Sequence, residues 1–238
     1  MRLIQLSETD STNTWLRNNF SGLSHGDAVT AYRQTAGRGR MGHDWLGSEG
    51  MLPLSVFLDA PNAAAAVTLG AALAVCRVLE PVIGSQLGIK WPNDIVYHGQ
   101  KLCGILCESF RDGDRTCIIC GIGVNVSQPA EYFQCIGLPH GGSLFSAAGV
   151  TADRSVLAAD IAAACADICL LPFADIYKEY RQRCVNLGRE VRLIQNGAER
   201  VAFAEDVSDS GALVCRDANG SFEVSSGEVS VRGLYGYV

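Results

Sequence analysis

The stretch from Gln34 to Trp45 concentrates residues that could hold an anion. It contains three glycines and two arginines, Arg38 and Arg40. Glycine lets the backbone adopt positive φ angles and approach a ligand closely. A guanidinium group can grip phosphate or carboxylate oxygens in two places. Because this composition suits neither a helix nor a strand, we expect a binding loop.

The spacing of Gly37, Gly39 and Gly42 matches the fingerprint of dinucleotide-binding proteins. That fingerprint requires a helix to begin at the loop, whereas residues 43–50 contain two more glycines and no apolar helical period. His43 and Asp44 also stand where a phosphate-binding P-loop has Lys and then Ser or Thr. We therefore expect the arginines and the loop amides, and not a helix N-terminus, to hold the anion.

Two lysines further along, Lys90 and Lys101, are each flanked by apolar residues typical of strands. For either lysine alone, a solvated surface position is the ordinary interpretation. Together with the arginines of the loop, the two lysines favour a second interpretation, in which they bind an anionic substrate. A sheet is a poor place for an unpaired charge and a good place for a charge to meet an anionic substrate.

Several elements must position these residues. The polar cluster Asp10-Ser-Thr-Asn13 is expected to cap a short helix. These residues either serve the cap alone or also offer polar groups to a ligand. A tight hairpin is expected at His98-Gly99. Strands are expected at residues 3–6, 27–32, 51–58, 101–108 and 116–126, and strand-forming residues with a Trp-Pro-Asn-Asp kink at 89–97. Helices are expected at 63–80, ending before Pro81, at 153–171 and at 173–183. The expected apolar face of the 153–171 helix comprises Val156, Leu157, Ile161, Ala164, Cys165 and Ile168.

The character of the sequence changes after Gly188. Five short strands separated by turn signals are expected at residues 191–194, 202–204, 212–215, 222–224 and 229–231. Closely spaced short strands of this kind predict a small barrel. We place the boundary near residue 185, which gives units of 1–184 and 185–238.

Composition restricts the partners. The net charge is −6, which gives no reason to expect nucleic-acid binding. The chain lacks a signal peptide at its start, and no run approaches the ~20 apolar residues of a membrane span. We therefore expect a cytoplasmic protein without membrane or nucleic-acid partners. Its ten cysteines are expected to be buried apolar groups, because their spacing suits neither zinc nor a disulfide framework.

The chain resembles the biotin protein ligase family, in a short form without the N-terminal DNA-binding domain, so no DNA-binding role is expected. The motifs that carry the resemblance cover nearly the whole chain. They are Asp10-Ser-Thr-Asn13, Gln34-Thr-Ala-Gly-Arg-Gly-Arg40 with Gly42 and Trp45, Lys90-Trp-Pro-Asn-Asp94, Lys101-Leu-Cys-Gly-Ile-Leu106, Gly121-Ile-Gly-Val-Asn125 and the tail 226–232. The resemblance implies an α+β fold, with a class II synthetase-like mixed sheet, flanking helices and a C-terminal SH3-like β-barrel.

The resemblance also implies an activity and its site. Members of the family use ATP to activate biotin as biotinyl-5'-AMP and then transfer biotin to a lysine of a biotin carboxyl carrier protein domain. Lys101, Arg38 and Arg40 are implied at the reacting carboxylate and phosphates. The biotin end is implied to comprise Ser11, Thr12, Asn13 and Gln34 under Trp45, and the nucleotide end Lys90, Asn93, Asp94 and Asn125, with Asp94 also holding Mg²⁺. Gly37, Gly39, Trp91 and Gly104 complete the implied binding residues.

Some questions stay open. Met41 and His43 stand where the family often has a further basic residue, so the loop is less positive here. Cys103 stands where small residues are usual and is expected to be a core filler. The alternatives are a lipoate or octanoate transferase of the same fold and, in another class, a nonenzymatic RNA-binding module. The carrier, the formation of a homodimer and any pairing of an edge strand near Gly121 are also open.

Overall fold

The computed structural model describes residues 1–42, 44–45, 47–59, 64–195, 197–225, 230–233 and 237. The expectations for His43, for a helix start at Ala63 and for residues 226–229 lie outside the described residues.

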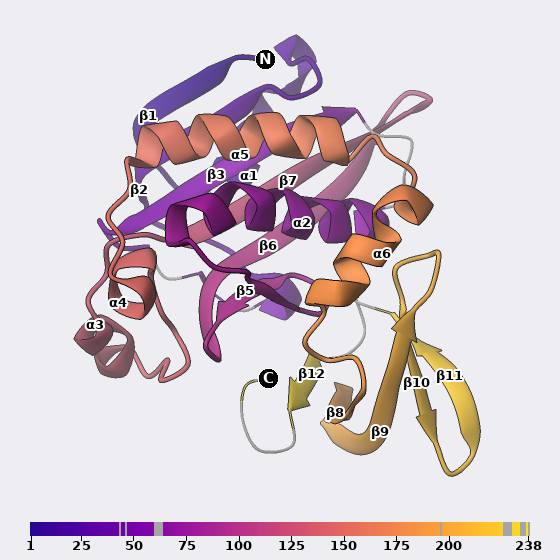
Figure 1. Ribbon diagram of the computed structural model, residues 1–238. Helices are drawn as coiled ribbons and strands as arrows, with labels where there is room; N and C mark the ends of the chain where they lie inside the picture. The colour runs from indigo at the N-terminus through magenta and orange to yellow at the C-terminus, as the bar shows by residue number, and fades with distance from the viewer. Residues whose placement is uncertain are drawn as a thin grey trace.

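A seven-stranded mixed sheet forms the larger part of the molecule (Figure 1). Its strands are β1 (Leu3–Thr9), β2 (Ala28–Gln34), β3 (Met51–Asp59), β4 (Gly88–Lys90), β5 (Asp94–Tyr97), β6 (Gln100–Asp112) and β7 (Arg115–Asn125). Their order is β1-β2-β3-β7-β6-β5-β4, with β1 parallel to β2 and the other pairs antiparallel. Strand β7 is therefore central, which corrects the idea of an edge strand near Gly121.

Helices cover both faces of this sheet. Helices α2 (Ala64–Ile83) and α5 (Arg154–Ile168) lie over one face, and α1 (Thr12–Asn18) packs on the other. Strand residues alternate between the two cores because successive side chains point to opposite faces. Val56 and Leu58 join the larger core, whereas Phe57 joins Leu16 of α1 in the smaller one. The remaining helices are α3 (Ala130–Cys135), α4 (Leu144–Ala148) and α6 (Phe173–Arg183), with short 3-10 turns at Phe20–Gly22 and Arg40–Gly42.

Helix α2 departs from expectation at its end, because it continues through Pro81 to Ile83. Proline removes one N–H group, and here the last turn is held by other bonds. Gly84 N donates to Glu80 O at 2.8 Å, and the Glu80 carboxylate accepts from Leu87 N and from Arg183. The stretch 65–83 is also long and apolar enough to cross a membrane by length and composition, contrary to expectation, but 61% of its most apolar window is buried within the fold.

Helix α5 also corrects one prediction. Val156 was assigned to its apolar face but is 57% exposed. The buried stripe is centred on Leu157, Ile161 and Cys165 and extends to neighbouring alanines. At 100° per residue, Val156 lies on the opposite side of the helix from the centre of that stripe.

A second, antiparallel sheet follows α6. It contains β8 (Arg189–Gln195), β9 (Ala198–Val207), β10 (Leu213–Asp217), β11 (Gly220–Val224) and β12 (Ser230–Gly233), in the order β11-β10-β9-β8-β12. Buried residues of this sheet, such as Val191 and Leu193, belong to the same core cluster as α2 and β3. The expected α+β class, a mixed sheet with flanking helices and a C-terminal β unit, is confirmed.

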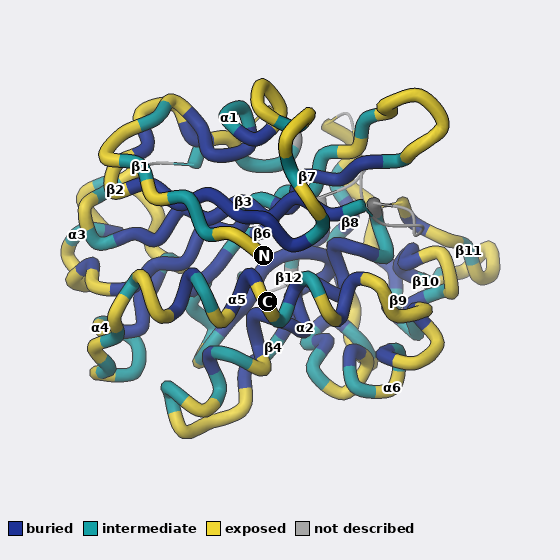
Figure 2. Tube along the Cα trace, turned by 90° about the horizontal axis from the view of Figure 1, so that it is seen from above, coloured by how far each residue is buried: buried dark blue, intermediate teal, exposed yellow. Residues whose placement is uncertain are grey.

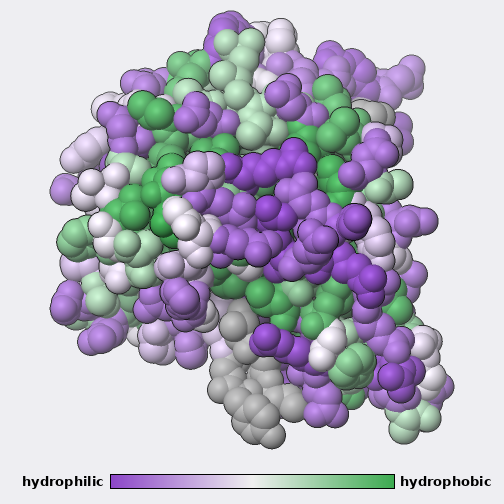
Figure 3. Space-filling model, viewed as in Figure 1, coloured by the Kyte–Doolittle hydropathy of each residue, from purple (hydrophilic) through white to green (hydrophobic). Residues whose placement is uncertain are grey.

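Burial follows these layers. Figure 2 shows the central strands as largely buried, with exposed residues gathered in the connections and outer helix faces. Helix α6 has its outer face in solvent, and hydrophilic residues gather over this part of the surface in Figure 3. All ten cysteines are free thiols, and eight of them are buried, with Cys107 partly buried and Cys135 exposed. In the described residues no group of His, Cys, Asp and Glu has the arrangement of a metal site.

Candidate functional site

A groove lies on the sheet, over strands β3, β6 and β7, beside the start of α1 and under the 34–45 loop. Its floor is backbone, because Gly104 and Gly123 are register partners in β6 and β7. A Cβ atom added at Gly123 would lie 2.4 Å from Trp45 Cε2, and one at Gly104 would lie 2.8 Å from Trp45 Cζ3. The indole of Trp45 therefore rests directly on the floor, which only glycines permit.

One end of the groove is a network of uncharged polar groups. Gln34 Oε1 accepts hydrogen bonds from the backbone N–H of Thr12 at 2.9 Å and from its hydroxyl at 3.2 Å. The hydroxyl of Ser55 lies 2.7 Å from Thr12 Oγ1 and 2.6 Å from Asn13 Oδ1. These residues are buried, so the network is rigid and presents fixed donors and acceptors.

The start of α1 explains why these groups face the groove. Ser11 is the N-cap, and its side chain accepts from Thr14 N at 3.4 Å. Thr12 and Asn13 then follow in the first turn, where their side chains line the groove. Ser11 therefore caps the helix and its two neighbours line the groove, while their binding of a ligand stays a prediction.

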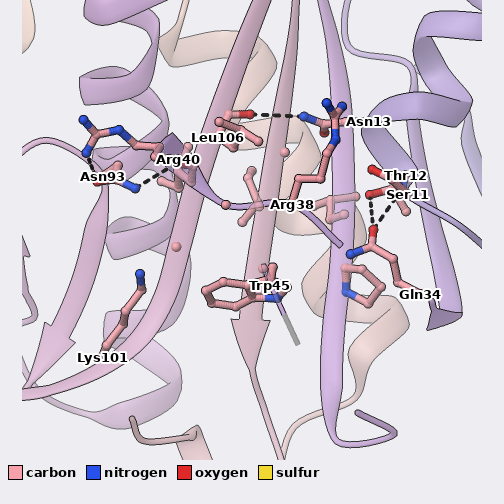
Figure 4. A pocket seen from close by; sticks show the side chains of 18 residues that line it. Ser11, Thr12, Asn13, Gln34, Arg38, Arg40, Trp45, Asn93, Lys101 and Leu106 are labelled. Carbon is pink, nitrogen blue, oxygen red and sulfur yellow. Dashed lines mark hydrogen bonds between the residues drawn. The ribbon is translucent and has the colours of Figure 1, made fainter. Parts of the chain in front are cut away.

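The opposite end carries cations. Lys101 Nζ lies 2.6 Å from Asp94 Oδ1, and Arg40 donates to Asn93 Oδ1 at 2.9 Å. Burial lowers the pKa of Lys90 to about 8. Burial raises the pKa of the Asp94 carboxyl, but the charges of Lys101 and Lys90 outweigh it and hold this pKa below its ordinary value. Figure 4 shows Lys101, Arg40 and Asn93 across the pocket from Thr12 and Gln34, with Trp45 between them.

The strand register positions this cationic end. Lys90 pairs with Asp94 across β4 and β5, and Asp94 pairs with Gly104 across β5 and β6. The segment 138–142 pairs with the start of β6, since Lys101 N donates to His140 O at 2.7 Å. Asn125 Nδ2 supports this arrangement by donating to the carbonyls of Gly142, at 2.9 Å, and of Lys101, at 3.3 Å.

The glycine loop closes the groove from above. Trp45 N donates to Gly37 O at 2.9 Å, and a side chain at Gly37 would strike Gln34 Nε2 and Trp45 O. Arg38 reaches the carboxylate of Glu108 on β6. In the described part of residues 34–50 the only helical feature is the 3-10 turn at Arg40–Gly42. The expectation that no α-helix starts at this loop is therefore confirmed for those residues.

Most of the residues picked out in the sequence meet here. Those that line the groove are Ser11, Thr12, Asn13, Gln34, Arg38, Gly39, Arg40, Trp45, Asn93, Lys101 and Gly104. Lys90 and Asp94 lie beside its cationic end, and Asn125 holds the strand behind Lys101.

Trp91 does not face the groove. Its indole N–H donates to Gly211 O at 3.1 Å, and its backbone N–H donates to Asn186 Oδ1 at 2.7 Å. The side chain is buried against the C-terminal unit, so it ties that unit to the turn between β4 and β5. Trp91 therefore does not line this groove, and its assignment as a ligand-binding residue stays a prediction.

Sequence reasoning missed Ser55, Glu108 and Tyr237 at the site. Glu108 lies two and four residues beyond Leu106 and Gly104 on β6, and the strand period of two could have put all three on the groove side. Tyr237, whose hydroxyl donates to Asp94 Oδ2, has no such signal, because it reaches the site from the C-terminal unit.

Comparisons with known proteins show which family the chain resembles. Residues 5–125 match the model of the biotin/lipoate A/B protein ligase family, and residues 187–232 match that of the biotin protein ligase C-terminal domain. A biotin-[acetyl-CoA-carboxylase] ligase of Paracoccus denitrificans is 32% identical over 96% of this chain and 100% of its own length. A ligase of the same name from Mycobacterium tuberculosis is 33% identical over 94% of this chain and 86% of its own.

A solved structure has the same fold. The biotin protein ligase of Aquifex aeolicus, in complex with biotin and ATP, superposes with a TM-score of 0.82 at 28% identity, over 98% of this chain and 99% of that one. The family models, the full-length relatives and this structure lead to one conclusion. The chain belongs to the biotin protein ligase family.

Proposed function

We propose that the groove activates biotin with ATP and transfers it to the carrier domain, with each end of the groove serving one part of the intermediate. As a member of its family, the chain is an ATP-dependent biotin ligase that acts on a biotin carboxyl carrier protein domain. The proposal concerns which residues carry each step. It is supported above all by the division of one groove into an uncharged polar end and a cationic end.

Biotin suits this division. Its ureido ring is neutral and carries both N–H donors and a carbonyl acceptor, which the amides and hydroxyls of Thr12, Asn13 and Gln34 can match. Leaving such buried groups unpaired would be costly, so they favour a ligand that pairs with them. Biotin's carboxylate would then lie beside the indole of Trp45, which rests on the glycine floor, and reach towards Lys101.

The first step joins two anions. A carboxylate oxygen attacks the α-phosphorus of ATP, an acyl–phosphate bond forms, and the bond to the β-phosphate breaks to release pyrophosphate. We propose that Lys101 stabilises the negative charge that develops between biotin's carboxylate and the α-phosphate of ATP. Arg38 and Arg40 would bind the phosphates. Fixed cations in a closed groove stabilise this developing charge and hold the reactants in line.

The second step moves biotin to the carrier. The deprotonated amine of a carrier lysine attacks the acyl carbon, an amide forms, and AMP leaves. The acyl-adenylate is prone to hydrolysis, so we assign the 34–45 loop and Trp45 to shielding it from water until the carrier docks.

One residue at the cationic end, Asp94, is suited to bind Mg²⁺. Mg²⁺ on a nucleotide usually takes one or two carboxylates plus phosphate oxygens, and Asp94 is a buried carboxylate beside Lys101. We propose that Asp94 would hold the ion, which would screen the charge of the phosphates. No further carboxylate is assigned to it.

We also propose the domain boundaries, cellular location and partners of the protein. We assign residues 1–184 to the catalytic unit and 185–238 to the C-terminal unit. We also expect a cytoplasmic protein. The net charge of −6 argues against nonspecific nucleic-acid binding, and the burial of α2 argues against a membrane span. A homodimer is an expectation that light scattering would test.

Exchange of labelled pyrophosphate into ATP tests the proposal. We expect exchange with biotin and none when lipoate replaces it, followed by biotin transfer to a carrier domain. Lys101→Gln should lower the exchange rate by about 10²-fold or more, whereas Lys178→Gln on α6 should not change it. Full exchange in Lys101→Gln would remove Lys101 from the reaction, and exchange driven by lipoate would support the rival activity.

A further inference from the structure

Tyr237 lies at the cationic end of the groove, although it follows the last strand of the C-terminal unit. Its hydroxyl donates a hydrogen bond to Asp94 Oδ2. Its ring stacks on the imidazole of His140, with the ring centroids 5.6 Å apart and an interplanar angle of 21°. Tyr237 thus joins the C-terminal unit to two segments that border the groove.

The ring of Tyr237 also covers a cation. Lys90 Nζ lies 3.6 Å from the ring centroid, and the guanidinium carbon of Arg232 lies 5.7 Å from it. A cation over an aromatic face is attracted by the electrons of the ring, more strongly where water is excluded. Lys90 is 5% exposed, so the ring of Tyr237 covers a cation that is already largely shielded from water.

These contacts leave the charged groups of the nucleotide end engaged with one another. Asp94 accepts from Tyr237 with one oxygen and pairs with Lys101 through the other. Lys90 faces the ring. The ring covers one side of the Lys90 ammonium, so a polyphosphate that approaches from that side can reach the ammonium only if the ring moves aside.

We propose that Tyr237 is a gate carried by the C-terminal unit, which occupies the nucleotide end of the groove at rest and is displaced when ATP binds. The inference rests on the proposed location of the nucleotide beside Lys90 and Asp94. It assigns to the C-terminal unit a direct part in nucleotide binding. The opposite arrangement, in which Tyr237 stays in place as a wall of the nucleotide site, predicts the reverse results in both tests below.

Kinetics separate a gate from a wall. Removing a gate lowers the KM for ATP, because binding no longer has to break the contacts of the tyrosine. We expect Tyr237→Ala to lower the KM for ATP about five-fold in pyrophosphate exchange and to leave the KM for biotin unchanged. Tyr237→Phe, which loses only the bond to Asp94, should have a smaller effect in the same direction. Tyr32→Ala, at a site that is 58% exposed, is the control. A raised or unchanged KM for ATP in Tyr237→Ala would overturn the gate.

Chemical labelling provides a readout that does not depend on turnover. Tetranitromethane nitrates accessible tyrosines, so in the wild-type protein without nucleotide Tyr237 should react more slowly than Tyr32. A nonhydrolysable ATP analogue should speed nitration of Tyr237 several-fold and leave Tyr32 unchanged, as measured by peptide mass spectrometry. Protection of Tyr237, or no change, would overturn the gate. If the wild-type protein showed no biotin-dependent exchange of pyrophosphate into ATP, the proposed function itself would be contradicted. A failure of the gate and a failure of the proposed function are therefore distinguishable.

Discussion

Arg38 in the glycine loop donates a hydrogen bond to Glu108 on β6, across 3.0 Å between Nη2 and Oε2. The same carboxylate oxygen accepts from Asn13 Nδ2 at 2.8 Å. One side chain therefore links the loop that covers the groove to the polar end beneath it. In this state Arg38 is paired with a carboxylate of the protein through one of its five N–H donors.

Glu108→Gln should loosen the loop. The Arg38 side chain is 51% exposed and that of Glu108 is 25% exposed, so the ion pair adds less than about 1 kcal/mol to global stability. Its loss should instead speed amide exchange in residues 37–42 several-fold, measured by hydrogen–deuterium exchange. Glu8→Gln breaks the exposed pair with Arg33 outside the groove and is the matched control. Equal exchange in Glu108→Gln and the wild-type protein would contradict the link.

Ligand should have the opposite effect on the same segment. Because biotinyl-5'-AMP offers Arg38 and Arg40 a phosphate, we expect exchange in residues 34–45 to slow when it binds. Similar exchange with and without the intermediate would count against a loop that orders on binding.

Arg40→Gly should weaken retention of the intermediate. The Arg40 guanidinium lies beside Asn93 and is sufficiently buried that desolvation lowers its pKa, yet an arginine remains charged. A charge-assisted hydrogen bond to phosphate contributes about 1.5–3 kcal/mol, so dissociation should speed by about 10–100-fold. Labelling of lysines on an added bystander protein would report the leak. Arg33→Gly is the control, and unchanged retention would remove Arg40 from the site.

The sequence was sufficient for the parts of the site that lie within contiguous motifs. Thr12, Gln34 and Lys101 were picked out because each belongs to a short run with distinctive neighbours, and the family resemblance implied that these runs meet. Ser55 was not picked out. Its hydroxyl joins the polar network only because β3 lies next to β2 and under α1, which no local pattern in residues 51–58 reveals.

The departures from expectation have the same origin in long-range packing. Trp91 belongs to a functional motif, yet its indole is satisfied by Gly211 in the C-terminal unit. Pro81 is a helix breaker by local chemistry, but bonds to Glu80 from residues beyond the helix preserve the last turn. Tyr237 stands near the end of the sequence without a polar motif around it, and only tertiary contacts bring it to Asp94.

Gly123→Ala should impair biotin binding. Its Cβ would lie 2.4 Å from Trp45 Cε2 and 2.5 Å from Nε1, so the indole would have to leave the groove floor. Overpacking of this kind costs about 1–3 kcal/mol, and we expect the KM for biotin to rise about 10-fold or more. Gly22→Ala, where an added Cβ meets nothing within 4 Å, is the control for a general effect of alanine. An unchanged KM for biotin in Gly123→Ala would show that Trp45 does not need this floor.

The thiol of Cys184 should make stability depend on alkaline pH. Burial raises its pKa from 9.0 to about 11, so the folded state keeps its proton when the unfolded state has lost it. The resulting stabilisation is complete below pH 9 and is lost as the pH rises to about 11, by up to about 3 kcal/mol for a shift of this size. Urea unfolding of the wild-type protein and Cys184→Ala at pH 7.5, 9 and 10.5 measures the difference. We expect the wild-type protein to lose its advantage over the variant across this range, because alanine has no proton to release. A difference that stays constant with pH would show that Cys184 is not held as a neutral thiol in the core.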